Sequence, residues 1–303
     1  MKKEIIFLSP YFDYKIWGGN RLKKFGYIGN EKIGEALMIS ALENKESVAT
    51  SGIFKDHLLS DIFQNNKELF GNFQGSYPLL TKIIDANDDL SVQVHPNNEY
   101  AIKHFNKLGK TECWYILDCP EDAKIVYGSK ETDIKKIEQY INDGSWDKFL
   151  KYEKVKKGDV VYVPSGTIHA ITKGILTYEI QQSSDLTFRL FDYNRLESDG
   201  QPRELHIQDS LNCIEVNDDL KVIPSSDGLI IDSEIFKLRK ETVKGEKIIH
   251  ISQAYWLECV IIQGEGTIND QPIKKGDAFI ISHNNKAIIK GDLEVLIGYI
   301  EIV

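Results

Sequence analysis

The amino-acid sequence predicts a mainly β protein. Short runs of β-branched and aromatic residues, bounded by Gly, Pro, Asn and Asp, recur in residues 79–96, 113–117, 154–193 and 223–303. The run that begins at Gly276-Asp277 parallels the run that begins at Gly158-Asp159, so the chain contains a weak internal repeat. These observations predict two related β-barrels, the second one degenerate.

The chain is expected to form two domains. A Pro-Ser-Ser-Asp-Gly segment at 224–228 interrupts the strand pattern. It gives a first domain of residues 1–222 and a C-terminal β domain of residues 223–303. Apolar residues at helical spacing predict small helical insertions in the first domain, with Asn97 as the N-cap of the second insertion. The insertions are expected at about 54–72, 97–108 and 130–150.

Composition and charge exclude several classes of protein. The 303 residues are 42% hydrophobic and 27% charged, as in an ordinary folded chain. A net charge of −9 offers no basic surface to nucleic acid, and no apolar run approaches the roughly 18 residues of a membrane helix. The N-terminus lacks a secretion signal and the cysteines form no C-x-x-C pair, so a cytoplasmic protein with free thiols is expected. The sequence gives no indication of oligomeric state.

Three segments supply groups that bind metals. In a strand through residues 92–95, Gln93 and His95 project from the same face because side chains alternate. Glu112 lies at the edge of the next strand-like run, and a third strand leads through a Pro/Gly turn to His169. Two imidazoles, a carboxylate and an amide oxygen suit a catalytic divalent metal that keeps an open coordination position.

The spacing around the last histidine is more specific than the residue types. Gly158, Pro164, Gly166 and His169 form the pattern G-x5-P-x-G-x2-H, which matches the second sequence motif of the cupin β-barrels. A lone loop histidine is usually a hydrogen-bonded structural residue, but the full motif favours metal ligation. The second copy of the repeat, continued without gaps, has Ala287 at the position of His169. The C-terminal barrel is therefore expected to have no metal site.

The sequence resembles the type I mannose-6-phosphate isomerases, zinc enzymes of the cupin superfamily, in their shorter bacterial form. The matching stretches are Ile16-Trp17-Gly18-Gly19, Gln93-Val94-His95-Pro96-Asn97, Lys110-Thr111-Glu112, Gly166-Thr167-Ile168-His169, and Glu179-Ile180-Gln181-Gln182 leading to Arg189. The resemblance implies that mannose 6-phosphate and fructose 6-phosphate are interconverted through a cis-enediol. It makes His95, Glu112 and His169 ligands of one zinc ion per chain, with Gln93 as a fourth ligand.

The same resemblance assigns a catalytic role to Arg189, which would otherwise be interpreted as an exposed cross-strand cation. Lys110 and Glu112 face the same side of an extended segment, so Lys110 is a candidate for binding the substrate. It could meet the phosphate or pair with the Glu112 carboxylate. The general base is left open among Glu179, a metal-bound hydroxide and a histidine such as His206.

Two other functions are open. Two histidines and a carboxylate are also the iron(II) site of cupin dioxygenases, which oxygen consumption or iron content would identify. A non-enzymatic sugar-phosphate-binding cupin would keep Lys110 and Arg189 without turnover. Such a sensor usually carries an output module, and the sequence shows no helix-turn-helix segment or basic face.

Overall fold

The computed structural model describes residues 4–197, 199–217 and 219–302. The described chain consists mainly of antiparallel β-sheets with short helices, which confirms the mainly β prediction. It divides into two compact units that are each built from separate stretches of sequence. Unit 1 comprises residues 1–13, 20–83 and 225–303, and unit 2 comprises residues 14–19 and 84–224. No described helix is long and apolar enough to cross a membrane.

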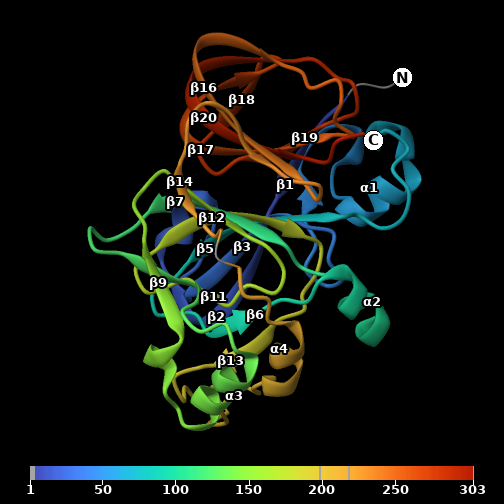
Figure 1. The fold of residues 1–303 in the computed structure, drawn as a ribbon. Coiled ribbons are helices and arrows are strands. Elements are labelled where there is room, and N and C mark those ends of the chain that lie inside the picture. Colours follow the sequence, from blue (N-terminus) through green and yellow to red (C-terminus); the bar gives the residue numbers. More distant parts are fainter. Residues whose placement is uncertain (1–3, 198, 218, 303) are drawn as a thin grey trace. The chain divides into compact units, whose positions relative to one another are not determined.

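Unit 1 contains a large antiparallel sheet with the strand order β15-β16-β20-β17-β19-β1-β4, and β18 pairs with β17. The long strands of its C-terminal part are orange to red in Figure 1. The bounds are β1 (Ile5–Ser9), β4 (Val48–Ala49), β15 (Gly228–Asp232), β16 (Lys237–Ile249), β17 (Leu257–Ile268), β18 (Gln271–Lys274), β19 (Ala278–Ile281) and β20 (Ala287–Tyr299).

The rest of unit 1 is β3 (Ile33–Ile39) and a set of short helices. The insertion predicted at 54–72 is present as α1 and two flanking 3₁₀ turns, η2 and η3. Strands β2 (Tyr11–Gly19) and β5 (Leu79–Asp85) belong partly to each unit. The helical bounds are η1 (Arg21–Phe25), η2 (Gly52–Phe54), α1 (Leu59–Asn65) and η3 (Lys67–Phe70).

The division of the chain into units differs from the expected domains because of the N-terminal strand, β1. Residues 1–13 and 20–83 were expected in the first domain, but they lie in the same unit as the C-terminal repeat. The physical reason is pairing: Ile5 of β1 lies opposite Ile281 of β19, and Leu8 of β1 lies opposite Ala49 of β4. Only the C-terminal boundary, at 224/225, falls close to the expected 222/223.

Unit 2 contains two antiparallel arrays of strands. One runs β14-β10-β7-β12, and the other is a five-stranded sheet in the order β13-β6-β11-β8-β9. The bounds are β6 (Val92–Val94), β7 (Glu112–Asp118), β8 (Lys124–Ser129), β9 (Leu150–Lys154), β10 (Asp159–Val163), β11 (His169–Ala170), β12 (Leu176–Gln182), β13 (Phe188–Phe191) and β14 (Val222–Pro224).

The helices of unit 2 include both of its predicted insertions. The helix α2 (Asn98–Phe105) begins after Asn97, whose side chain accepts the Tyr100 N–H at 2.9 Å as the predicted N-cap. The insertion at 130–150 forms α3 (Ile134–Asn142) and η4 (Trp146–Lys148), and it buries its apolar stripe in the unit 2 core. The helix α4 (Ile207–Cys213) was not predicted.

The internal repeat is visible in the backbone. Gly158 and Gly276 have φ values of 87° and 94°, the left-handed conformation that glycine adopts most readily. In each copy the aspartate that follows, Asp159 or Asp277, accepts a backbone N–H from three residues earlier, at 2.9 Å and 2.8 Å. The two runs therefore enter their strands through the same turn.

The register of the two copies shows which residues of the second copy stand at the positions of Glu112 and His169. Glu112 lies opposite Val163, and the repeat aligns Val163 with Ile281, which lies opposite Leu257. Leu257 thus takes the position of the carboxylate, and Ala287 takes that of the second histidine. Both side chains are buried in the apolar core of unit 1, where polar ligands without a metal would be costly.

Unit 1 nevertheless buries the Glu258 carboxyl on β17 completely, at 0% exposure. Tyr77 and Thr81 donate their hydroxyl groups to its two oxygens, each at 2.6 Å. Burial raises the pKa of Glu258 to about 7, because removal of the carboxylate from water outweighs the lowering by these hydrogen bonds. At pH values between the pKa of Glu258 in the unfolded chain and that in the folded protein, the folded protein therefore keeps a proton on Glu258 that the unfolded chain has lost.

Stability should consequently fall as the pH rises from about 5 to about 8. In this window the native state binds more protons at Glu258 than the unfolded state, so the free energy of unfolding decreases with pH, by up to about 3 kcal/mol. In Glu258→Gln this part of the pH dependence should disappear. Urea unfolding of both proteins, with chelator present to exclude metal linkage, measures the difference. Parallel stability profiles for the two would contradict the assignment.

Candidate metal centre

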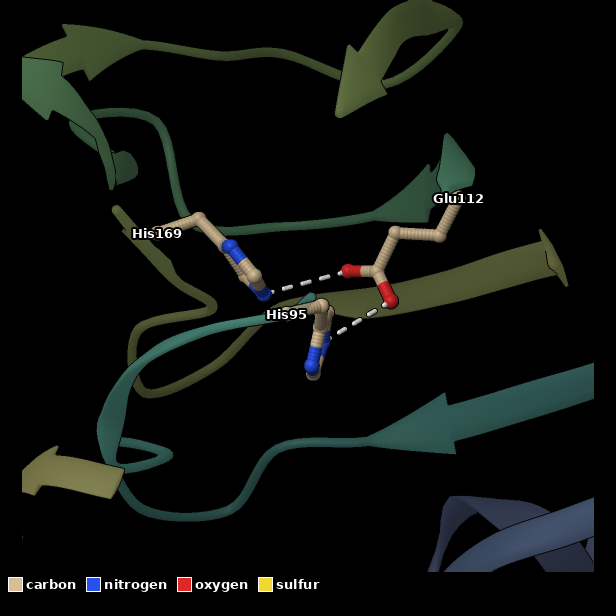
Figure 2. Close-up of side chains that lie close together, drawn as sticks. All are labelled: His95, Glu112 and His169. Carbon is tan, nitrogen blue, oxygen red and sulfur yellow. Dashed lines mark ion pairs between the residues drawn. The ribbon is translucent and has the colours of Figure 1, made fainter. Parts of the chain in front are cut away.

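His95, Glu112 and His169 come together from three strands of unit 2. His169 begins β11 and lies opposite Gln93 of β6, while His95 follows β6 directly and Glu112 begins β7. Figure 2 shows the Glu112 carboxylate with one oxygen directed to each imidazole. The structure therefore brings together the three groups that the sequence predicted as ligands.

A glycine turn places His169. The Thr167 N–H donates to Pro164 O at 3.2 Å, and Gly166 has a φ of 84°, as required at the third position of this turn. The Gly166 N–H then donates to His95 O at 2.8 Å. The Pro-x-Gly segment, which precedes His169, is thus hydrogen-bonded to the backbone of His95.

A second glycine allows the chain to return beside the first histidine. A Cβ atom on Gly109 would lie 2.5 Å from the Asn97 carbonyl carbon, so only glycine fits there. The Lys110 N–H donates to Pro96 O at 2.9 Å. This close approach positions the Gly-Lys-Thr-Glu segment and hence the carboxylate of Glu112.

The three side chains fit a divalent cation. Their ligand atoms lie within 4.8 Å of one another, and each residue is no more than 1% exposed. Glu112 Oε2 is 3.3 Å from His95 Nε2, and Glu112 Oε1 is 3.3 Å from His169 Nε2. Among the described residues, both carboxylate oxygens and both ring nitrogens of His95 lack hydrogen-bond partners. Buried polar atoms are rarely left so, and a metal would satisfy them.

The backbone sets the tautomer of His169. Its Nδ1 lies 2.8 Å from Thr167 O, and a carbonyl oxygen can only accept, so Nδ1 carries the proton. The lone pair therefore lies on Nε2, the nitrogen that faces Glu112. This is the usual arrangement of a metal-binding histidine, whose outer nitrogen is fixed by a neighbouring acceptor.

Electrostatics keep the site in the protonation state that metals need. Burial, together with the nearby Lys110 ammonium, lowers the pKa of His95 to about 3, and burial also lowers the pKa of His169. Burial acts to raise the pKa of Glu112, but Lys110 and the two histidines outweigh it and hold that pKa well below its ordinary value. Neutral imidazoles beside an ionised carboxylate bind a cation without first losing protons.

Lys110 and Gln93 flank the three ligands. Lys110 is 5% exposed, and its Nζ lies 3.2 Å from Glu112 Oε2, which is the ion pair foreseen as one of its two roles. Gln93 presents its amide nitrogen to His169 Nε2 at 3.2 Å, and its oxygen lies 3.4 Å from Ser91 Oγ. Ligation by the Gln93 oxygen requires a half-turn of the amide and stays a prediction.

Comparison with known proteins places this site in a family. A family model described as phosphomannose isomerase type I, catalytic domain, matches residues 5–121. Mannose-6-phosphate isomerase ManA of Bacillus subtilis is 40% identical over 318 residues, which cover 99% of this chain and 100% of the relative. The chain belongs to the type I phosphomannose isomerase family. The mannose-6-phosphate isomerase of Streptococcus mutans is 42% identical, with 98% of each chain covered.

Solved structures agree. The crystal structure of the mannose 6-phosphate isomerase from Bacillus subtilis superposes with a TM-score of 0.92 at 39% identity, over 98% of this chain and 99% of that chain. A mutant phosphomannose isomerase from Salmonella typhimurium shares the fold at 16% identity, with a TM-score of 0.80 over 98% of this chain and 100% of that chain. The predicted family and cupin-type fold are confirmed.

In this member of the family, Arg189 lies close to the ligand strand. It is opposite Gln93 in the β13–β6 pair, and directly opposite residues share one face of a sheet. Arg189 Nη1 donates to Glu204 O at 2.7 Å, whereas its Nε is buried without a partner among the described residues. Burial and then the neighbouring Arg203 lower the pKa of Arg189. The guanidinium is thus anchored through Nη1, while its buried Nε–H is a donor without a partner among the described residues.

His206 is bound to the backbone of Arg189. The Arg189 N–H donates to His206 Nδ1 at 3.2 Å, and the His206 N–H donates to Arg189 O at 2.8 Å. Since Nδ1 accepts, neutral His206 carries its proton on Nε2 and has no free lone pair to take another. As arranged, His206 supports the arginine and is unsuited to act as the general base.

Glu179 is still a candidate for the general base. It lies opposite Trp114 across β12 and β7, and Trp114 Nε1 donates to Glu179 Oε2 at 2.8 Å. The Trp114 ring packs edge-on against the His169 ring, with centroids 5.5 Å apart. The contacts from Glu179 through Trp114 to His169 therefore connect this carboxylate to the candidate metal ligands.

Some supporting residues were missed from the sequence. Thr167 fixes the His169 tautomer through its carbonyl oxygen, and Ser91 contacts the Gln93 amide. Both lie two residues before a candidate ligand, which is the available signal in the sequence. Trp114 is two residues after Glu112, so the alternation of a strand could have placed it beside the ligands.

Removal of a ligand should remove the metal. His95→Ala or His169→Ala should weaken metal binding by more than about 100-fold, above the range for loss of an outer hydrogen-bond partner. Glu112→Gln should also weaken binding while leaving the fold intact. Elemental analysis of the dialysed proteins measures the bound metal.

The matched control for the ligand variants is His283→Ala in unit 1. Within the residues that the structure describes, the hydrogen-bond contacts of His283 Nδ1 are with the backbone oxygens of Ala254 and Tyr255, at 3.3 Å and 3.1 Å. Its replacement should leave metal content unchanged. Stoichiometric loss of metal from this control, or full metal content in the ligand variants, would contradict the site.

Proposed function

We propose that this chain is a zinc-dependent mannose-6-phosphate isomerase, with one zinc ion held by His95, Glu112 and His169. The observation that carries the proposal is the buried group of two neutral imidazoles and one ionised carboxylate with unsatisfied ligand atoms, in a member of the type I phosphomannose isomerase family. Imidazole nitrogen and carboxylate oxygen are ordinary zinc ligands, and three protein ligands leave a position for substrate.

The reaction moves a proton between C1 and C2 of the sugar through a cis-enediol, while negative charge develops on O1 and O2. The bound metal supplies Lewis-acid polarisation of those oxygens. Arg189 would supply its unpaired Nε–H donor to the same charge. Glu179 is the carboxylate proposed to carry the proton, and Lys110 is the cation that holds substrate beside Glu112.

The substrate class follows from charge and family together. On a chain of net charge −9, a dianionic sugar phosphate needs local cations, and Lys110 and Arg189 are two such groups in unit 2. No disulfide joins the four cysteines in the described part of the chain, which is compatible with a reducing compartment. We therefore assign the activity to the cytoplasm.

A coupled assay tests the proposal directly. Purified protein should convert mannose 6-phosphate to fructose 6-phosphate, lose activity on treatment with a chelator, and regain it when zinc is restored. Oxygen consumption should stay at background, in contrast to an iron(II) dioxygenase. Full activity of metal-free protein would refute the metal dependence, and absence of turnover by zinc-loaded protein would refute the isomerase itself.

Arg189→Lys should lower turnover far more than stability. Lysine keeps the charge but lacks the planar fork of donors, so kcat should fall about 100-fold, the scale for removing one donor to a developing oxyanion. The free energy of unfolding should change by only about 1 kcal/mol, because a single hydrogen bond to Glu204 O is altered. Steady-state kinetics and urea unfolding provide the two readouts. Normal turnover with a large loss of stability would make Arg189 structural.

Lys110→Ala should separate the two roles of this lysine. If Lys110 binds the phosphate, the variant should lose about 2 to 5 kcal/mol of transition-state binding with mannose 6-phosphate. Unphosphorylated mannose, a poor substrate, should be almost unaffected. Comparison of kcat/KM for the two sugars makes the measurement.

The alternative role of Lys110 is that of an ion-pair partner of Glu112, and it gives the opposite expectation. Equal losses on both sugars, or loss of metal from the variant, would show that Lys110 acts through the carboxylate ligand. Metal content must therefore be determined on the same preparation.

A further inference from the structure

Gln181 on β12 has a buried acceptor with no partner. The residue is 0% exposed, and its Oε1 lacks a hydrogen bond among the described residues. Its Nε2 donates to Gln182 O at 2.7 Å and to Ser184 O at 2.8 Å. Carbonyl oxygens only accept, so these two contacts fix which end of the amide is the nitrogen. The oxygen is therefore locked as an acceptor that lacks a donor.

The register places this acceptor beside the metal group. Gln181 lies directly opposite Glu112 in the β12–β7 pair, and Val163 of β10 lies opposite Glu112 on its other side. Directly opposite residues share a face, with Cβ atoms about 5 Å apart. Lys110, two residues before Glu112, faces the same side. The unpaired oxygen is thus on the sheet face that carries the carboxylate ligand and its lysine.

The adjacent glutamine provides a contrast. Gln182 Oε1 accepts the Thr111 N–H at 3.0 Å, and its Nε2 donates to Asn98 Oδ1 at 3.0 Å. Both ends of this amide are satisfied on the other face of the strand. Buried polar atoms are normally paired, so an acceptor left unpaired on the metal-facing side alone indicates a donor that arrives with the substrate.

We infer that Gln181 is a specificity-determining residue, whose Oε1 accepts a hydrogen bond from the hydroxyl on C3 or C4 of the bound sugar phosphate. The inference rests on the proposed isomerase function. The C1 and C2 oxygens take part in the reaction itself, and the next hydroxyls along the carbon chain are the nearest remaining donors. Because the amide cannot reverse, the site takes a hydroxyl there and disfavours a sugar that lacks it.

The test pairs Gln181→Met with Gln182→Met, since each variant loses two side-chain hydrogen bonds but only the first loses the unpaired acceptor. Both are assayed, with wild type, on mannose 6-phosphate and on its 3-deoxy and 4-deoxy analogues. Wild type should lose about 10- to 100-fold in kcat/KM on one analogue, the cost of leaving one buried group unpaired. On the parent sugar, kcat/KM of Gln181→Met should be lower than that of wild type by a similar factor. On that analogue, kcat/KM of Gln181→Met should be no lower than on the parent sugar. Gln182→Met should keep the wild-type ratio, and all three should hold equal metal.

The outcomes are distinct. If Gln181→Met discriminates against both analogues as strongly as wild type does, the inference is overturned. Equal kcat/KM of wild type on the parent and both analogues also overturns it, and this measurement holds even if the variant fails to fold. Absence of wild-type turnover on the parent sugar, by contrast, is failure of the proposed function itself.

Discussion

A carboxylate buried without hydrogen bonds is the constraint on which unit 2 depends. Glu112 is fully buried, and in the described part of the chain its oxygens meet two imidazoles and the Lys110 ammonium at ion-pair distance. Taking such a charge out of water is costly unless it is paired and hydrogen-bonded. A single lysine compensates the charge but leaves the lone pairs unused. A divalent cation would compensate the charge and also use the lone pairs, so the Glu112 carboxylate favours the binding of a cation.

Irregular segments of the chain position the Glu112 carboxylate and its neighbours. Gly109 lets one segment pass against another, and Gly166 bends the chain so that His169 emerges toward Glu112. The register of the strands then fixes the surroundings: Gln181 stands opposite Glu112 and Arg189 opposite Gln93. A slip of one residue would turn these side chains to the wrong face. Strand pairing, more than any single contact, therefore positions the polar groups.

Sequence reasoning succeeded where the signal was local. The spacing G-x5-P-x-G-x2-H encodes a turn and the ligand it delivers, and the Asn97 cap and the three insertions depend on neighbouring residues. It failed where partners are far apart in sequence, as in the pairing of β1 with β19. The irregular register between Arg189 and Phe191 is also not predictable from residue types, because a bulge changes the pairing without a distinct sequence signal. The tie between Arg189 and His206 depends on backbone geometry that composition does not encode.

The second copy of the repeat shows what the barrel requires in order to form. It keeps the glycine turn and the aspartate contact, yet has Leu257 and Ala287 where the first copy has Glu112 and His169. The architecture is thus stable with an entirely apolar interior at these positions, unlike small zinc domains whose folding free energy comes from the metal. The strand framework of the repeat therefore does not itself require the ligand set. Which ion occupies such a ligand set in a cell then depends on the geometry, on the ligand types and on which metals the cell makes available.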